Sequence, residues 1–157
     1  MNSWHQFIAM SAVLFIIAPV TAHAGGTINT SGALAQIVDK WKETEPEKGH
    51  KLVEYAGRCV DIPNDPAALK ATCTCTGNYE YMPDGSWKGA GSCTDTYQGG
   101  DQASFTWEEG SHLKEYPYKY TGGTGKYKAI TGGGTYFYEN LTDTLQGGWY
   151  KDKMVLP

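Results

Sequence analysis

The stretch GGTGKYKAITGGGTY, residues 122–136, places six glycines among fifteen residues, between two tyrosine-rich segments. Gly122, Gly123 and Gly125 can adopt positive φ, which suits a tight corner of the chain. Glycine within or beside a strand also marks a bulge, a barrel corner or the close approach of another backbone. The stretch therefore predicts two barrel corners around an aromatic plug, with Tyr127 and Ile130 in the core and the chain re-entering the sheet at residues 132–134 beside a close neighbour.

A phosphate-binding loop is the alternative interpretation of these glycines. Such a loop follows a buried apolar strand and opens a helix, often as GxxxxGK[ST]. Here Tyr120 and Thr121 precede the glycines, and Tyr127 follows Lys126. This context excludes a nucleotide loop and favours an architectural role.

The composition indicates a sheet protein without an electrostatic footprint for nucleic acid. The chain has 157 residues, 20 Gly, 11 Tyr and a formal net charge of −4. Tyrosine favours strands and glycine favours tight turns. A mildly acidic chain without basic runs does not predict binding to nucleic acid or to an anionic membrane.

Residues 1–24 carry the pattern of a secretory signal peptide. Phe7 to Ala18 is apolar, and Ala22-His23-Ala24 provides the small residues that a signal peptidase requires. We expect cleavage after Ala24 and a secreted or periplasmic protein. An uncleaved N-terminal anchor is the alternative, since no Lys or Arg precedes the apolar run.

The remaining chain predicts an N-terminal extension over residues 25–49 and an all-β domain over residues 50–157. Leu34, Ile37, Val38 and Trp41 have the i, i+3, i+4, i+7 spacing of one helix face, which predicts a short helix over residues 31–42. Short strands with turn residues between them indicate a closed antiparallel β-barrel of about eight strands. The expected strands cover residues 50–60, 71–81, 87–97, 102–108, 113–120, 135–139 and 144–155.

Four cysteines behind a secretory signal favour two disulfides. Residues 82–86 form a predicted hairpin turn, so the residue numbers of opposed positions add up to about 168 and Cys75 lies opposite Cys93. Cross-strand Cβ atoms lie near the separation that a disulfide requires. We therefore predict Cys75–Cys93 and, by elimination, Cys59–Cys73. The alternative is a metal site, which the C-x-C spacing of Cys73 and Cys75 does not favour, and we expect no bound metal.

The segment Gly122–Gly132 resembles the GGTGxFxxAxG signature of dirigent proteins and the similar stretch of allene oxide cyclases. Tyr127 occupies the aromatic position, and Ile130 replaces the usual small residue. Gly100-Asp101 with Trp107 is similar to a pattern of bacterial members of unknown role. The resemblance covers about residues 50–157 and implies an eight-stranded antiparallel barrel, which in this superfamily can form trimers. The acidic residues with which the family steers reactive intermediates have no aligned counterparts in this chain.

Candidate chemistry gathers around residues 107–112. Glu109 and His112 are the catalytic candidates, because a carboxylate under an aromatic wall can act as a general acid or base. The alternative is a solvated turn with ordinary surface charges. Four aromatic residues are the candidate ligand-binding groups, with core packing or a subunit contact as the alternative: Phe105, Trp107, Tyr116 and Tyr118.

These observations favour a barrel that binds a small hydrophobic or aromatic ligand, or a structural envelope protein. A cyclase or dirigent-like catalyst that guides a reactive intermediate is the alternative. We expect no cofactor, and a homo-oligomer could form through an exposed face of the barrel.

Overall fold

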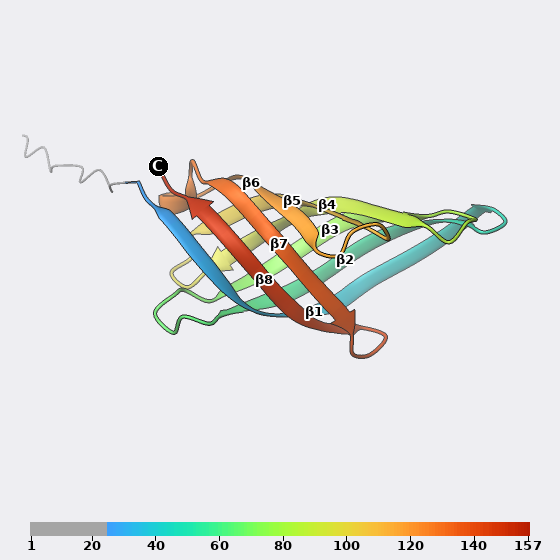
Figure 1. Ribbon diagram of the computed structural model, residues 1–157, viewed down its shortest axis with the longest axis horizontal. Coiled ribbons are helices and arrows are strands. Elements are labelled where there is room, and N and C mark those ends of the chain that lie inside the picture. Colours follow the sequence, from blue (N-terminus) through green and yellow to red (C-terminus); the bar gives the residue numbers. More distant parts are fainter. Residues whose placement is uncertain (1–24) are drawn as a thin grey trace, which may run out of the picture.

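The computed structural model describes residues 25–157, which form a closed antiparallel β-barrel whose strands are neighbours in chain order (Figure 1). The predicted signal peptide lies outside the described residues. A short 3₁₀ helix, η1 (Gly125–Tyr127), connects two of the strands. The eight strands are β1 (Thr27–Glu47), β2 (His50–Pro63), β3 (Ala71–Tyr81), β4 (Trp87–Tyr97), β5 (Gln102–Gly110), β6 (Tyr116–Gly123), β7 (Thr131–Asn140) and β8 (Leu145–Val155).

The barrel closes because β1 pairs with both β2 and β8. The register of the closing pair runs from Thr27 opposite Val155 to Ile37 opposite Leu145. The first and last described residues therefore meet at one end of the barrel, while the β1–β2 hairpin extends to the other end (Figure 1). Within residues 25–157, no helix has the length and hydropathy needed to cross a membrane.

The predicted helix over residues 31–42 is wrong, because these residues lie in β1. Leu34 and Gln36 are buried in the barrel, while Ile37 is 46% exposed on its outer face. A bulge between Val38 and Lys40 shifts the alternation by one residue, so Trp41 faces inward and its ring lies 5.3 Å from that of Tyr79. A strand with one bulge can therefore place apolar residues at the spacing that is typical of a helix face. The barrel accordingly starts within the segment that was expected to be an extension.

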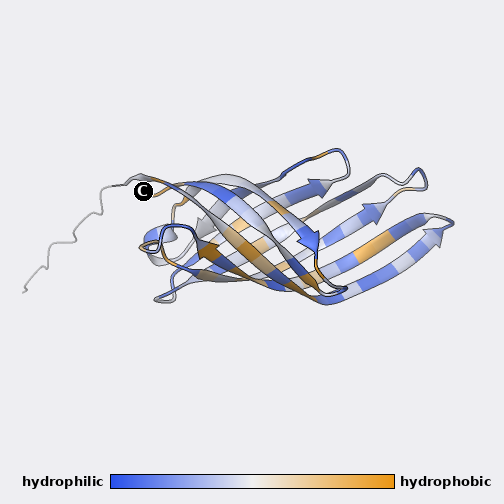
Figure 2. Ribbon diagram, turned by 60° about the horizontal axis from the view of Figure 1, so that its bottom comes forward, coloured by the Kyte–Doolittle hydropathy of each residue, from blue (hydrophilic) through white to orange (hydrophobic). Residues whose placement is uncertain are grey.

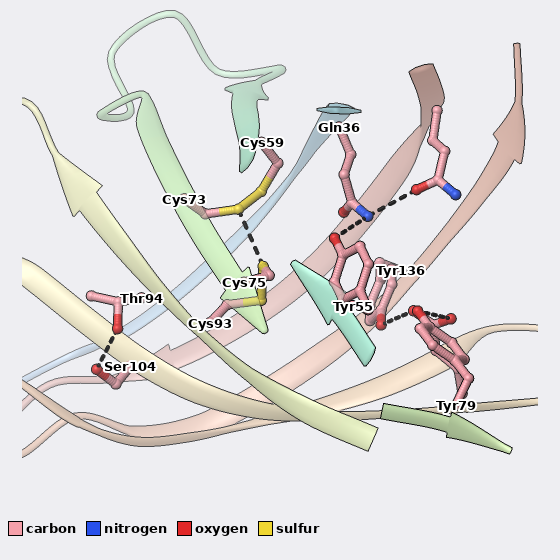
Figure 3. Close-up of a disulfide and its surroundings, with 12 residues drawn as sticks. Gln36, Tyr55, Cys59, Cys73, Cys75, Tyr79, Cys93, Thr94, Ser104 and Tyr136 are labelled. Atoms are coloured by element: carbon pink, nitrogen blue, oxygen red, sulfur yellow. Dashed lines mark hydrogen bonds between the residues drawn. A yellow bond between two sulfur atoms is a disulfide. The ribbon is translucent and has the colours of Figure 1, made fainter. Parts of the chain in front are cut away.

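Both predicted disulfides are confirmed. Cys75 lies opposite Cys93 in the β3–β4 register, and Cys59 lies opposite Cys73 in the β2–β3 register. All four side chains are buried inside the barrel. Figure 3 shows the two bridges side by side, with the Sγ atoms of Cys73 and Cys75 only 3.5 Å apart.

The glycine-rich stretch closes one end of the barrel much as its sequence predicts. Tyr127 and Ile130 are 3% and 2% exposed, and the Tyr127 ring stacks on Tyr97 with centroids 4.4 Å apart. Gly125 has φ of +52°, and a Cβ atom there would lie 1.9 Å from a carboxylate oxygen of Asp101. Only glycine suits this position.

Residues 132–134 differ in part from the expectation, since they form the beginning of β7 and not a second corner. The predicted close neighbour is present, because a Cβ atom on Gly132 would lie 2.1 Å from the Lys153 carbonyl oxygen. The glycines thus permit tight contact between β7 and β8.

Polar and apolar residues alternate along the strands, as Figure 2 shows. The outer face of β1, β2 and β8 nevertheless carries an apolar patch of Ile37, Val60, Ile62 and Leu145, each between 37% and 46% exposed. Ile37 is the register partner of Leu145, and the neighbouring alanines of β1 pair with Val60 and Ile62. A homo-oligomer stays a prediction.

Candidate functional site

The barrel contains a partly open cavity of about 260 Å³. Eight tyrosines contribute to its wall, together with both disulfides and a few aliphatic side chains. Four carboxylates also line it, and no Lys, Arg or His is among the lining residues of the described chain. The carboxylates are Asp61, Asp95, Glu109 and Asp152.

Three of the four predicted ligand-binding residues lie on this cavity: Phe105, Trp107 and Tyr118. The rings of Phe105 and Tyr118 pack with centroids 5.0 Å apart. Trp107 is 3% exposed, and its Nε1 has no hydrogen-bond partner within residues 25–157. Tyr116 lies outside the cavity wall and packs against Trp87 and Tyr136. The structure thus brings together an aromatic wall with a free indole donor.

Glu109 is the carboxylate at the end of β5, away from the end of the barrel where the first and last described residues meet. Three hydroxyl groups donate hydrogen bonds to it: Tyr79 over 3.0 Å, Tyr136 over 2.5 Å and Tyr138 over 2.7 Å. Burial raises the pKa of the Glu109 carboxyl, although the three tyrosine hydrogen bonds favour its charged form. Both oxygens therefore have partners from the protein itself. We call Glu109 with these tyrosines the glutamate site.

His112 lines a groove together with Glu109 at this end of the barrel but, within residues 25–157, makes no hydrogen bond to the glutamate site. It is exposed in the loop after β5, whereas the Glu109 side chain is only 4% exposed and faces the interior. No hydrogen bond connects the two residues within the described chain. The alternation of side chains along β5 correctly places Glu109 inside the barrel, but it ends with the strand and does not apply to His112 in the loop.

Three aspartates at the opposite end of the barrel were missed by the sequence reasoning. Asp61, Asp95 and Asp152 lie near the ends of β2, β4 and β8, which run in the same direction. We call them the aspartate cluster. Tyr127, which follows the glycine corner, packs in the same group of buried residues as Tyr97, Tyr120 and Met154 at this end. The glycine-rich stretch therefore covers the aspartate cluster.

The aspartate cluster has fewer hydrogen bonds than Glu109. The Tyr120 hydroxyl donates to Asp152 Oδ2 over 2.9 Å, and the Tyr97 hydroxyl reaches Asp95 Oδ2 at 3.5 Å. Oδ1 of Asp95 and Oδ1 of Asp152 are buried without a hydrogen-bond partner in the described chain. Two carboxylate oxygens are thus available at the cavity wall.

The electrostatics of the aspartate cluster favour protonation. Burial, followed by repulsion from Asp152, raises the pKa of Asp61 from 3.8 to about 7. Burial raises the pKa of Asp152 to about 6. Burial and the charges of Asp61 and Asp152 raise the pKa of Asp95 well above 3.8. Carboxylic acids that share a dry site cannot all ionise without cost.

A neutral polar network separates the two acidic sites on one side of the barrel. Gln36 Nε2 donates to the Tyr55 hydroxyl over 2.7 Å and to Gln146 Oε1 over 2.8 Å. Figure 3 shows Gln36 and Tyr55 beside the disulfides. The side-chain amides of this network bring no formal charge, so nothing on the cavity wall neutralises the carboxylates.

Comparisons with known proteins identify the fold. No protein-family model and no curated protein matches this chain. The solved structure of the pterocarpan synthase dirigent protein GePTS1 is similar over 89% of this chain and 97% of that one, with 10% identity and a TM-score of 0.58. A protein of unknown function from the DUF3224 family of Shewanella oneidensis is similar over 84% of this chain and 98% of its own, with 12% identity and a TM-score of 0.55.

The chain therefore has the dirigent-like barrel fold, as its glycine signature indicates. At 10–12% identity the likeness concerns the fold alone. A fold hosts many functions, so the function has to be argued from the site.

Proposed function

We propose that this protein binds a small hydrophobic or aromatic molecule inside its barrel. The observation that carries the proposal is the cavity itself, with Phe105, Trp107 and Tyr118 on its wall. Ligand sites are typically concave and mostly apolar, with a few polar groups that fix orientation. The free Trp107 Nε1 and the aspartate oxygens supply such groups.

A larger apolar side chain at Ala71 would reduce the volume of the cavity without changing the charge of the protein. Ala71 is 5% exposed and lines the cavity, whereas Ala90 is exposed on the outer face of the barrel. We expect Ala71→Leu to weaken the binding of para-cresol at least about tenfold, because added methyl groups occupy the ligand's space. Ala90→Leu is the matched control and should bind like the wild type. Saturation-transfer NMR with thermal melts of each variant measures both binding and folding.

Equal binding of para-cresol by two folded variants would place the ligand outside the cavity. The proposed function would then be wrong for this site. Failure of the wild type to bind any small aromatic probe would contradict it as well.

The two buried disulfides and the predicted signal peptide in residues 1–24 support a location outside the cytoplasm. Disulfides form and persist in secreted and periplasmic proteins. We therefore propose a secreted or periplasmic binding protein. Mass determination of the exported chain would test this proposal through the loss of residues 1–24.

A cyclase or dirigent-like catalyst is the second candidate function. It is favoured by the unpartnered oxygens of Asp95 and Asp152, because a protonated carboxyl in a dry cavity can donate a proton to a reacting group. Glu109 is less suited to this role, since tyrosines occupy both of its oxygens. Recovery of a bound ligand with unchanged structure and stereochemistry would exclude this candidate.

A further inference from the structure

The ionisable groups with which the cavity could hold a charged ligand are acidic. The cavity wall contains four carboxylates and, within residues 25–157, no basic side chain. Lys151 and Lys153 flank Asp152 in β8, but both are exposed on the outer face. A negative cavity with no internal counterion attracts a cation.

The carboxylates at the two ends of the cavity differ in how many of their oxygens accept a hydrogen bond from the protein. At the glutamate site, both carboxylate oxygens accept hydrogen bonds from tyrosine hydroxyls. At the other end, Asp95 is 4% exposed and Asp152 is 8% exposed, and each has one buried oxygen with no partner in the described chain. A buried carboxylate without a partner destabilises a protein considerably. Its persistence in a cavity wall points to a partner from outside the chain.

The surroundings of the aspartate cluster are aromatic. Tyr97, Tyr120 and Tyr127 line the same end of the cavity. The hydroxyls of Tyr97 and Tyr120 are directed toward the carboxylates. Aromatic rings beside a carboxylate form a favourable environment for an organic ammonium group, through cation–π attraction and charge-assisted hydrogen bonds.

A bare metal ion fits this end less well. Within residues 25–157, the only group of potential ligand atoms that lie within 4.8 Å of one another is Cys59, Cys73 and Cys75, and these cysteines are engaged in disulfides. The aspartates do not form such a tight group. An ammonium group attached to an apolar body matches both the wider spacing and the aromatic wall.

We propose that the aspartate cluster binds the ammonium group of a small aromatic amine, whose ring lies against Phe105, Trp107 and Tyr118. This inference rests on the proposed function, because it names the ligand class of the same cavity. Asp95 and Asp152 accept the N–H groups through their unpartnered oxygens, and Asp61 adds a third negative charge.

The titratable groups that face the ammonium site decide its pH dependence. They are Asp61 and Tyr55 from β2, Tyr79 from β3, Asp95 and Tyr97 from β4, Glu109 from β5, Tyr118 and Tyr120 from β6, Tyr127 from η1, Tyr136 from β7, and Tyr150 and Asp152 from β8. The tyrosines stay neutral, since burial raises their pKa values. The aspartates must ionise to bind a cation, so amine binding strengthens as the pH rises through about 6 to 7 and releases protons.

The experiment compares two probes of nearly equal shape, 2-phenylethylamine and 2-phenylethanol, by calorimetry on the purified protein. We expect the amine to bind at least about tenfold more tightly than the alcohol near pH 8 and to lose this preference near pH 5. Asp95→Asn should remove the preference for the amine over the alcohol. Asp84→Asn, in the exposed β3–β4 turn, is the matched control and should bind both probes like the wild type.

The outcomes distinguish a failure of the ammonium site from a failure of the proposed ligand-binding function. If the amine and the alcohol bind equally near pH 8, the cation site is wrong and the proposed ligand-binding function stands. If neither probe binds, the proposed function fails with it. If Asp95→Asn does not fold, the wild type still decides. Amine binding near pH 6 to 7 without proton release, measured in two buffers of different ionisation enthalpy, contradicts the proposal.

Discussion

Lowering the pH from about 8 to about 5 is expected to raise the free energy of unfolding by about 4 kcal/mol. The reason is the aspartate cluster, where burial and mutual repulsion raise the pKa of Asp61 to about 7 and that of Asp152 to about 6, from 3.8. These carboxyls bind protons more tightly in the folded barrel than in the unfolded chain. Their stabilising contribution is complete below about pH 4 and is lost as the pH rises through about 6 to 7.

Urea unfolding at a series of pH values measures this dependence. A variant with Asp61→Asn, Asp95→Asn and Asp152→Asn should lose most of the pH dependence and should be at least as stable as the wild type near pH 8. The control is Asp84→Asn, which changes an exposed carboxylate in a turn. A wild-type stability that is flat or rises between about pH 5 and pH 8 would show that the aspartates are ionised and well solvated.

Removing one disulfide should lower the free energy of unfolding by about 3 kcal/mol. Cys59–Cys73 spans 14 residues and Cys75–Cys93 spans 18, and loops of this size restrict the unfolded chain substantially. The sulfur atoms also fill the middle of the barrel, so their loss leaves a void. We expect Cys59→Ala/Cys73→Ala to lower the guanidinium concentration at the unfolding midpoint and to leave the Cys75–Cys93 bridge intact.

The matched control is Thr72→Ala/Thr74→Ala, on the outward face of the same strand β3. This pair should cost under about 1 kcal/mol, as is usual for exposed positions. Similar losses in the two double variants would mean that the cross-link contributes little beyond the strand preference of its positions.

Local signals predicted most of the barrel. The turn at residues 82–86 sets the register that pairs Cys75 with Cys93, and positive φ at Gly125 explains the glycine signature. The helix prediction failed because periodicity alone cannot distinguish a helix from a strand with a bulge at residue 39. Only pairing with β2 and β8 decides between them.

The aspartate cluster could have been predicted in part. Disulfide-bonded Cys59 and Cys93 face the interior, and alternation places Asp61 and Asp95 on the same face two residues later. Asp152 had no such marker in its strand. That the three aspartates meet at one end depends on the closure of β8 onto β1, which no local pattern reveals.

The central claim is that the barrel interior holds the ligand, and the ¹⁵N-labelled indole groups test it most directly. Trp107 Nε1 is buried and unpartnered at the cavity wall, while Trp149 lies on the outer face of β8 beside Phe137 and Lys151. Addition of para-cresol should shift the Trp107 indole N–H resonance and leave that of Trp149 in place. A Trp107 signal that does not move at saturating ligand, with Trp149 shifting in its stead, would contradict the account.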